Sequence, residues 1–267
     1  MPYLEQQNSK IYYKIIGEGE PVIFIAGLAA NHRNWGMQFG SLKKYYKLIA
    51  VDNRGIGKSV GEICRLNIED MVEDINMLVD SMKLENPHII GHSMGAMIAF
   101  EFVKKYPHKV SSLILASLPI NKTKVIREDP SKELYSLIDG KDNNFNNKMV
   151  SYLFSNHFMH TEKYEVLKSM FSYSHNDYKR DVIEAQLNAI NEWKQLRRWE
   201  IGMENVPYMV VYGSEDKFAS IDHSYLSKIF PSASIKVFKN SGHAVHIEKA
   251  KEFNMIVRQF IKEKTDS

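Results

Sequence analysis

The sequence has little of several features that would narrow its class at once. It holds a single cysteine in 267 residues, Cys64, which excludes an internal disulfide. No apolar run approaches the roughly 18 residues that a membrane-spanning helix needs, so we expect no membrane span. The formal net charge is only +3 and no basic block is present. This balance disfavours nucleic acid as a partner.

The first residues and the composition favour a folded chain without a targeting segment. The start of the sequence lacks the basic stretch and apolar core of a secretory signal, and we therefore expect a cytoplasmic location. Hydrophobic residues make up 44% and charged residues 25% of the chain, as in ordinary globular domains. A chain of this length can bury a sizeable core without disulfides or metals.

Short apolar runs alternate with segments of helical periodicity. The apolar runs predict strands over residues 10–16, 22–26, 46–51, 87–91, 110–116, 207–212 and 234–238. Asn67 is a predicted helix cap, with Asp70 three residues later and apolar residues at helical spacing as far as Met82. A last amphipathic helix is predicted over residues 249–263. This alternation predicts an α/β fold, with a mostly parallel sheet that helices cover on both faces.

The rhythm changes between residues 119 and 205, where no strand pattern is evident. Helical patterns occur instead, over residues 146–158, 161–173 and 177–193. We interpret this block as a helical cap, or lid, inserted over the carboxyl edge of the sheet, where such sheets bind ligands. The predicted domains are therefore an α/β core of residues 1–118 and 206–267 and a cap of residues 119–205.

The motif Gly-His-Ser-Met-Gly at residues 91–95 lies between a predicted strand and an apolar helix. In this context a sharp turn exposes the serine, Ser93, above the strand end. The N–H groups that begin the following helix point at the same place. A serine hydroxyl is a weak nucleophile and needs a base within hydrogen-bonding reach, held by an orienting group.

An acid and a histidine follow in the required order. Asp216 lies just after the predicted strand 207–212, and His243 lies just after the predicted strand 234–238. Both positions are at carboxyl ends of strands, and the order serine, acid, histidine is that of serine hydrolases built on α/β sheets. Glu215 is the alternative acid, because it neighbours Asp216.

Four segments, taken in order, resemble the α/β-hydrolase fold family. They are residues 52–59, 91–95, 213–216 and 241–248. The similar proteins are its lid-bearing members, which include esterases, enol-lactonases, carbon–carbon bond hydrolases and haloperoxidase-like enzymes. The resemblance implies an α/β-hydrolase fold, and it implies that no metal or organic cofactor takes part.

The resemblance also assigns roles to individual residues. It implies that Ser93 is the nucleophile, His243 the base, and Asp216 the residue that orients His243. It further implies an oxyanion hole made by the backbone N–H groups of Leu28 and Met94. Before Leu28 the sequence is Ala-Gly, where the family usually has His-Gly; a backbone donor does not require that histidine.

These residues predict a serine hydrolase that acts on a small to medium apolar acyl ester, lactone or thioester through an acyl-serine intermediate. We expect a monomer or a homodimer. Two alternatives stay open. One keeps the triad for carbon–carbon bond hydrolysis or for a cofactor-free lyase or perhydrolase reaction. The other is a ligand receptor with slow turnover, since fold alone does not fix function.

Other histidines and glycines have simpler interpretations. His92 is expected to pack beside the nucleophile, and His246 to be structural. The cap histidines lack acid or cysteine partners at metal-ligand spacing, so we expect surface or pocket-lining roles for His157, His160 and His175. Gly57-Lys58-Ser59 resembles the end of a phosphate-binding loop, but Asp52 occupies the position of its first glycine.

Overall fold

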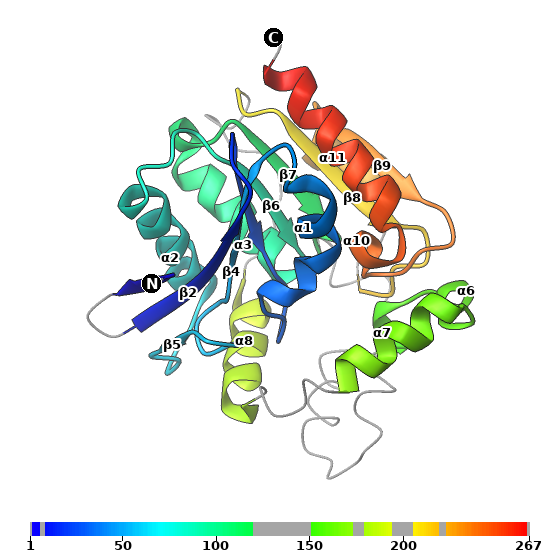
Figure 1. Cartoon of the computed structure of the whole chain (residues 1–267), viewed down its shortest axis with the longest axis horizontal. Helices are drawn as coiled ribbons and strands as arrows, with labels where there is room; N and C mark the ends of the chain where they lie inside the picture. The colour runs from blue at the N-terminus through cyan, green and yellow to red at the C-terminus, as the bar shows by residue number, and fades with distance from the viewer. Residues whose placement is uncertain are drawn as a thin grey trace.

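The computed structural model describes residues 2–5, 9–119, 151–172, 179–193, 205–218 and 223–265. In this part of the chain the strands form one nine-stranded sheet of order β1-β2-β4-β3-β6-β7-β8-β9, with β5 paired to β2 (Figure 1). β2 is antiparallel to β4. Along the rest of the sheet, in the order β4, β3, β6, β7, β8 and β9, each strand is parallel to the next. The strands are β1 (Tyr3–Glu5), β2 (Ser9–Ile16), β3 (Pro21–Ile25), β4 (Lys47–Val51), β5 (Val60–Gly61), β6 (His88–His92), β7 (Ser112–Ala116), β8 (Tyr208–Gly213) and β9 (Ser234–Phe238).

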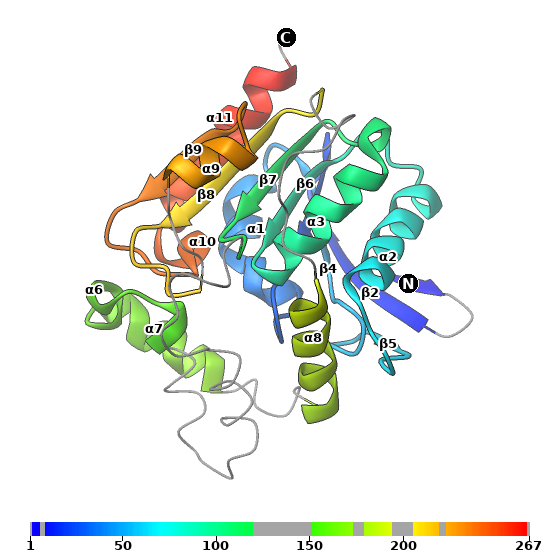
Figure 2. The same cartoon turned by 180° about the vertical axis from the view of Figure 1, so that it is seen from behind.

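Helices cover both faces of this sheet, as the two opposite views show (Figures 1 and 2). Successive residues of β3 alternate between the two layers: Ile23 packs in the core beneath α2, α3 and α9, and Phe24 packs in the core beneath α1 and α11. The α/β fold predicted from the alternation, with a mostly parallel sheet that helices cover on both faces, is therefore present. The helices around the sheet are α1 (Gly36–Leu42), α2 (Ile68–Ser81), α3 (Met94–Lys105), α9 (His223–Ile229), α10 (Val245–Glu248) and α11 (Ala250–Thr265).

Helix α2 begins where the sequence predicts. The Asn67 side chain accepts a hydrogen bond from the Asp70 N–H at 2.9 Å, and the Asp70 carboxylate accepts one from the Asn67 N–H at 3.1 Å. This reciprocal capping box uses two donors that the helix itself leaves unpaired. Further along α2, the buried Asp74 carboxylate accepts two hydrogen bonds from Arg54 and so ties the helix to the loop after β4.

The seven predicted strands agree with the structure to within two residues at each end. The sequence analysis missed the short strands β1 and β5, as well as α1 with the 3₁₀ turn before it, His32–Trp35. Helix α1 contains Gly36 and Gly40, which disfavour a helix locally; burial of Phe39 and Leu42 against the sheet supports it instead. No helix in the described ranges is both long and apolar enough to cross a membrane.

In the described part of the segment between β7 and β8, three helices stand at the carboxyl edge of the sheet (Figure 1). They are α6 (Asn156–Met159), α7 (Glu162–Ser172) and α8 (Arg180–Glu192). This position is the one predicted for a cap. Residues 120–150, 173–178 and 194–204 lie outside the described part of the chain, so the cap boundaries at 119 and 205 stay a prediction.

The helix predicted over residues 146–158 is interrupted near its C-terminal end. Residues 151–153 are helical, but Ser155 has the extended angles φ −68° and ψ 154° and caps a new helix, α6. Residues 146–150 lie outside the described part. The reason for the break is tertiary, because both the N–H and the hydroxyl of Ser155 bind Glu248, 93 residues away.

His88, at the start of β6, makes folding sensitive to acid. Its side chain is buried and bonded to the Ser112 hydroxyl at 2.8 Å, and burial lowers its pKa to about 4. In the unfolded chain His88 binds a proton near pH 6.5, whereas in the folded chain it stays neutral until about pH 4. The free energy of unfolding therefore falls as the pH falls from 6.5 to about 4. From pH 7 to pH 5 this group accounts for about 2 kcal/mol. We expect His88→Asn to lose about 2 kcal/mol less unfolding free energy than the wild type between pH 7 and pH 5, as measured by urea unfolding.

The exposed His108 supplies the control for this measurement. His108→Asn should leave the difference in unfolding free energy between pH 7 and pH 5 as it is in the wild type. Identical pH dependence in His88→Asn and the wild type would show that His88 does not carry the effect.

Candidate active site

Ser93 occupies a strained turn between β6 and α3. Its backbone angles are φ 55° and ψ −118°, in a region that residues with a Cβ rarely adopt. A Cβ on Gly91 would overlap the Gly95 carbonyl oxygen, and a Cβ on Gly95 would overlap that of Ile25. Only glycines allow the first turn of α3 to approach the sheet this closely. The turn leaves Ser93 half-buried at the carboxyl edge.

His243 and Asp216 form a buried pair at the same edge. Asp216 follows β8 and His243 follows β9, and the Nδ1 atom of His243 lies 2.9 and 3.0 Å from the two carboxylate oxygens. Because a carboxylate only accepts, Nδ1 carries the proton and Nε2 is left free to act as a base. The neighbouring Glu215 side chain is exposed and makes no such contact. The structure thus pairs His243 with Asp216 rather than with Glu215.

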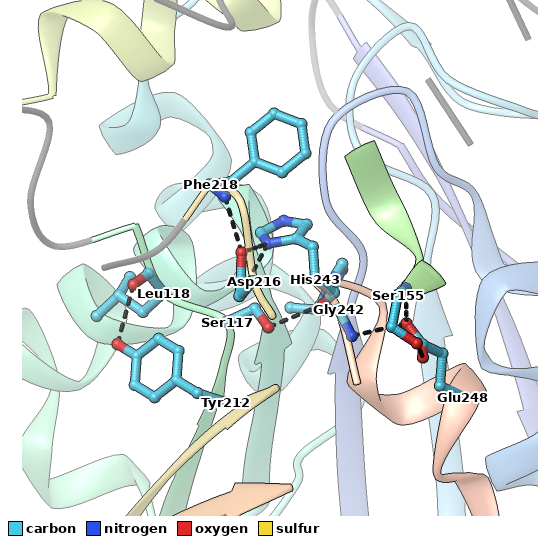
Figure 3. A network of polar contacts seen from close by, with 10 residues as sticks. Ser117, Leu118, Ser155, Tyr212, Asp216, Phe218, Gly242, His243 and Glu248 are labelled. Atoms are coloured by element: carbon cyan, nitrogen blue, oxygen red, sulfur yellow. Dashed lines mark hydrogen bonds and ion pairs between the residues drawn. The ribbon is translucent and has the colours of Figure 1, made fainter. Parts of the chain in front are cut away.

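The backbone of His243 is held from below (Figure 3). Its carbonyl oxygen accepts a hydrogen bond from the Ser117 hydroxyl at 2.8 Å and another from His92 Nε2 at 3.0 Å. Burial, with a smaller contribution from His243, lowers the pKa of His92 to about 3. His92 is therefore a neutral donor and does not compete with His243 as a base, in agreement with the packing role expected for it.

The two predicted oxyanion donors, Leu28 and Met94, belong to segments that lie next to Ser93. A Cβ on Gly27 would lie 3.1 Å from the Ser93 Cβ, so the loop after β3 passes next to the serine. Among the described residues, neither the Leu28 N–H nor the Met94 N–H has a hydrogen-bond partner within the protein. Met94 is the first residue of α3, whose first turn contains no acidic side chain that would offset its positive end.

The comparisons with known proteins agree with this geometry. Residues 20–250 match the model of a family described as "alpha/beta hydrolase fold". The chain belongs to this family. The match spans β3 to β9 together with Ser93, Asp216 and His243, and it leaves out β1, β2 and all of α11 except its first residue.

Individual relatives of this α/β hydrolase are distant. The AB hydrolase superfamily protein YisY of Bacillus subtilis is 25% identical, with 96% of each chain covered. The 2-hydroxy-6-oxo-6-phenylhexa-2,4-dienoate hydrolase of Comamonas testosteroni is 24% identical over 95% of this chain and 92% of its own. An enol-lactonase structure from Burkholderia xenovorans LB400 has a TM-score of 0.81 at 20% identity, covering 98% and 100% of the two chains. That structural likeness shows the fold alone.

Matches to some other curated relatives are partial. The chain covers only 44% of the length of one and 64% of the length of another. The comparisons therefore support a hydrolase but do not identify its substrate, which has to be inferred from the residues of the site.

Asp52 organises two loops near the site. One of its oxygens accepts hydrogen bonds from the backbone N–H of His32 at 2.7 Å and from His32 Nδ1 at 2.8 Å, and the other accepts one from the Lys58 N–H at 3.0 Å. Its neighbour Asn53 donates to the Ala26 carbonyl at 3.0 Å. The motif at residues 52–59 thus supports the loop that carries Leu28 and touches no reacting group itself.

The remaining histidines have structural surroundings. His246 is fully buried, accepts a hydrogen bond from Asn34 Nδ2 at 3.0 Å, and has a pKa well below its usual value because of burial. His160 Nδ1 donates to a carbonyl of its own helix at 2.7 Å. His175 lies outside the described residues. Within the described ranges no three His, Cys, Asp or Glu side chains gather as a metal site would require. Cys64 is an exposed free thiol.

Sequence reasoning missed several residues that the fold brings to the site. The Phe218 ring lies 4.7 Å from that of His243, and its N–H donates to Asp216 at 2.9 Å. Ser117 holds the His243 carbonyl, and its place directly after β7 was the one available signal. Nothing in the local sequence marks Phe218, since its role depends on contacts between loops.

Glu248 joins the histidine loop to the cap (Figure 3). One carboxylate oxygen accepts the N–H of Gly242 at 2.8 Å and that of Ser155 at 2.9 Å, and the other accepts the Ser155 hydroxyl at 2.7 Å. Burial raises the pKa of Glu248 although these three bonds act to lower it. The residue before His243 is thereby fixed to the start of α6.

We expect Glu248→Met to lower the free energy of unfolding by about 2–4 kcal/mol, because it leaves the buried N–H groups of Gly242 and Ser155 without a hydrogen-bond acceptor. Glu248→Gln is the matched control, since its amide oxygen can accept both N–H groups while its amide nitrogen donates to the Ser155 hydroxyl. Its expected loss is below about 1 kcal/mol. Denaturant unfolding measures both values, and equal losses would contradict this account of the contact.

Proposed function

We propose that this protein is a serine hydrolase that cleaves a small to medium apolar acyl ester, lactone or thioester through an acyl intermediate on Ser93. The observation that carries the proposal is the strained Ser93 at the N-terminus of α3, on the same sheet edge as the buried His243–Asp216 pair. Strain of this kind persists only where the surrounding structure enforces it, and it is concentrated at functional sites.

In the proposed mechanism His243 Nε2 takes the proton from the Ser93 hydroxyl as Oγ attacks the carbonyl carbon of the substrate. Asp216 keeps the His243 proton on Nδ1 and stabilises the imidazolium that forms. The N–H groups of Leu28 and Met94 bind the oxyanion of the tetrahedral intermediate. His243 then gives its proton to the leaving group, and a water activated by the same Nε2 hydrolyses the acyl-serine.

The surroundings of the site favour an apolar acyl group. Leu28 and Phe218 pack against Ile183 and Leu187 of α8, so the loops that carry the oxyanion donor and the acid meet an apolar cap face. Ligand sites of this kind recognise substrate mainly through hydrophobic contact.

The proposal is tested with p-nitrophenyl esters of increasing acyl length together with a fluorophosphonate probe. A burst of p-nitrophenol equal to the enzyme concentration, and mass-spectrometric mapping of the probe to Ser93, are the expected results. The preferred acyl length then measures the space under the cap. A protein that neither turns over esters nor reacts with the probe would contradict the proposal and favour a receptor.

A second candidate is carbon–carbon bond hydrolysis with the same triad. It is favoured by the match, over 95% of this chain, to the Comamonas testosteroni hydrolase, which is named for its 2-hydroxy-6-oxo-6-phenylhexa-2,4-dienoate substrate. Probe labelling of Ser93 without ester turnover would support this candidate. The test is then the loss of absorbance of a 2-hydroxy-6-oxo-dienoate on mixing with the protein.

A further inference from the structure

Gln186 reaches from the cap to the loop that carries the proposed oxyanion donor. It lies on α8, on the same helix face as Ile183 and Leu187, and its side chain is fully buried. Its Oε1 atom accepts a hydrogen bond from the backbone N–H of Ala29 at 3.0 Å. Ala29 directly follows Leu28, so this contact from 157 residues away is next to the oxyanion donor.

The loop is a tight turn with an unfavourable residue in it. The Ala30 N–H donates to the Gly27 carbonyl at 3.2 Å, which closes a four-residue turn, and Ala29 has a φ of 57°. A positive φ at this third position is the feature of a type II turn, where glycine is preferred. An alanine there favours a type I turn, in which the peptide between Leu28 and Ala29 is reversed and the ψ angle of Leu28 changes, unless a contact holds the Ala29 N–H in its present direction.

The Gln186 carboxamide is that contact. Asn53 fixes the Ala26 carbonyl before the turn, and Gln186 fixes the Ala29 N–H within it. Leu28, which is the residue between these anchors, keeps its own N–H without a partner among the described residues. The turn is therefore held on both sides, and the Leu28 N–H lies between the two anchors in a loop that passes next to Ser93.

Stability alone does not account for a glutamine here. The Nε2 atom of Gln186 is buried and has no hydrogen-bond partner in the described part of the chain. An unpaired buried donor costs free energy of folding, and an apolar side chain of the same length avoids that cost. Ala29 is only partly buried, so water can replace its partner in such a variant.

We propose that Gln186 is a positioning residue that holds the oxyanion turn in its active form, so that the cap helix completes the oxyanion hole. This inference rests on the proposed function, in which the Leu28 N–H binds the oxyanion. It requires that the effect of Gln186 falls on the transition state and not on substrate binding.

The test compares Gln186→Met with Glu184→Gln, which changes the same helix at a partly exposed position that bonds Arg180 and not the turn after β3. For the best p-nitrophenyl ester we expect Gln186→Met to lower kcat about 10- to 100-fold, part of the effect of losing one oxyanion donor. KM should stay within about twofold of the wild type, as for an interaction used only in the transition state. Glu184→Gln should stay close to the wild type in both constants.

Two further readouts separate positioning from a structural role. An alkyl boronic acid adds to the serine oxygen and places a boronate oxygen at the oxyanion position, so its Ki should rise in proportion to the loss of kcat in Gln186→Met. Adding Ala29→Gly to Gln186→Met should recover at least about threefold in kcat, because glycine adopts a positive φ without strain. The melting temperature should remain close to that of the wild type.

The inference fails if kcat is unchanged in Gln186→Met, if the loss appears only in KM, or if Glu184→Gln loses as much. These results are distinguishable from failure of the proposed function. If the fluorophosphonate does not label Ser93 in the wild type, the nucleophile assignment is overturned and the inference with it. If the wild type is labelled and turns over esters, a normal kcat in Gln186→Met overturns the inference alone.

Discussion

Replacing Ser93 with alanine is expected to abolish ester turnover, with a fall in kcat on the order of 10⁶. Alanine has no oxygen to attack the substrate, so no acyl intermediate can form. The Met94 and Leu28 N–H groups remain, and a small residual rate above that in water is expected from them. Stopped-flow measurement with the best p-nitrophenyl ester should show no burst, and the steady-state rate should not exceed this small residual rate.

The fold should be unaffected, because alanine keeps the Ser93 backbone contacts, including the N–H bond to the Ala116 carbonyl at 2.9 Å. Ser111→Ala is the matched control: Ser111 lies just before β7, at the opposite edge of the sheet, and bonds the Asn86 carbonyl at 2.6 Å. It should hydrolyse esters at the wild-type rate. Turnover retained in Ser93→Ala would remove Ser93 from the mechanism.

The central sheet was predictable because its signals are local. Most of the parallel strands are short apolar runs, such as Val22 to Ala26, that are buried on both faces, whereas β9 at the edge of the sheet is only partly buried. The elbow was predictable for the same reason, since its glycines and Ser93 fall within five residues. The acid and the histidine followed from counting strand ends, which a parallel sheet brings to one edge.

The parts that were not predictable depend on contacts between distant segments. Helix α1 forms despite two glycines because the sheet buries it, and the break at Ser155 exists because Glu248 binds it. Gln186 looks like any polar residue of an amphipathic helix until its bond to the Ala29 N–H is seen. Such roles leave no periodic or motif signal in a single sequence.

The site therefore has two kinds of support. The core supplies Ser93 and the His243–Asp216 pair from strand ends, where their geometry is fixed by the sheet. The cap supplies contacts to the loops beside them, through Glu248 at the histidine loop and Gln186 at the turn after β3. Under the proposed function, we expect substitutions in the predicted cap to change both the space for substrate and the positions of the loops beside Ser93 and His243, while the core stays the same.

Replacing Asp216 with asparagine is expected to lower kcat about 10⁴-fold while the fold is retained. At present both carboxylate oxygens face His243 Nδ1, and one of them also accepts the Phe218 N–H. An asparagine must turn an NH₂ group toward one of these two donors. If it faces Nδ1, the His243 proton moves to Nε2, and the imidazole can no longer take the proton of Ser93.

The matched control for this substitution is Glu215→Gln, because Glu215 is the neighbouring acid and its side chain is exposed. It should keep kcat within about twofold of the wild type, as expected for a surface change away from the reacting groups. The low-field proton resonance of His243 Nδ1–H should disappear in Asp216→Asn and persist in Glu215→Gln. A larger loss of kcat in Glu215→Gln would transfer the orienting role to Glu215. Because the structure directs both Asp216 oxygens at the ring, we expect the loss to follow Asp216.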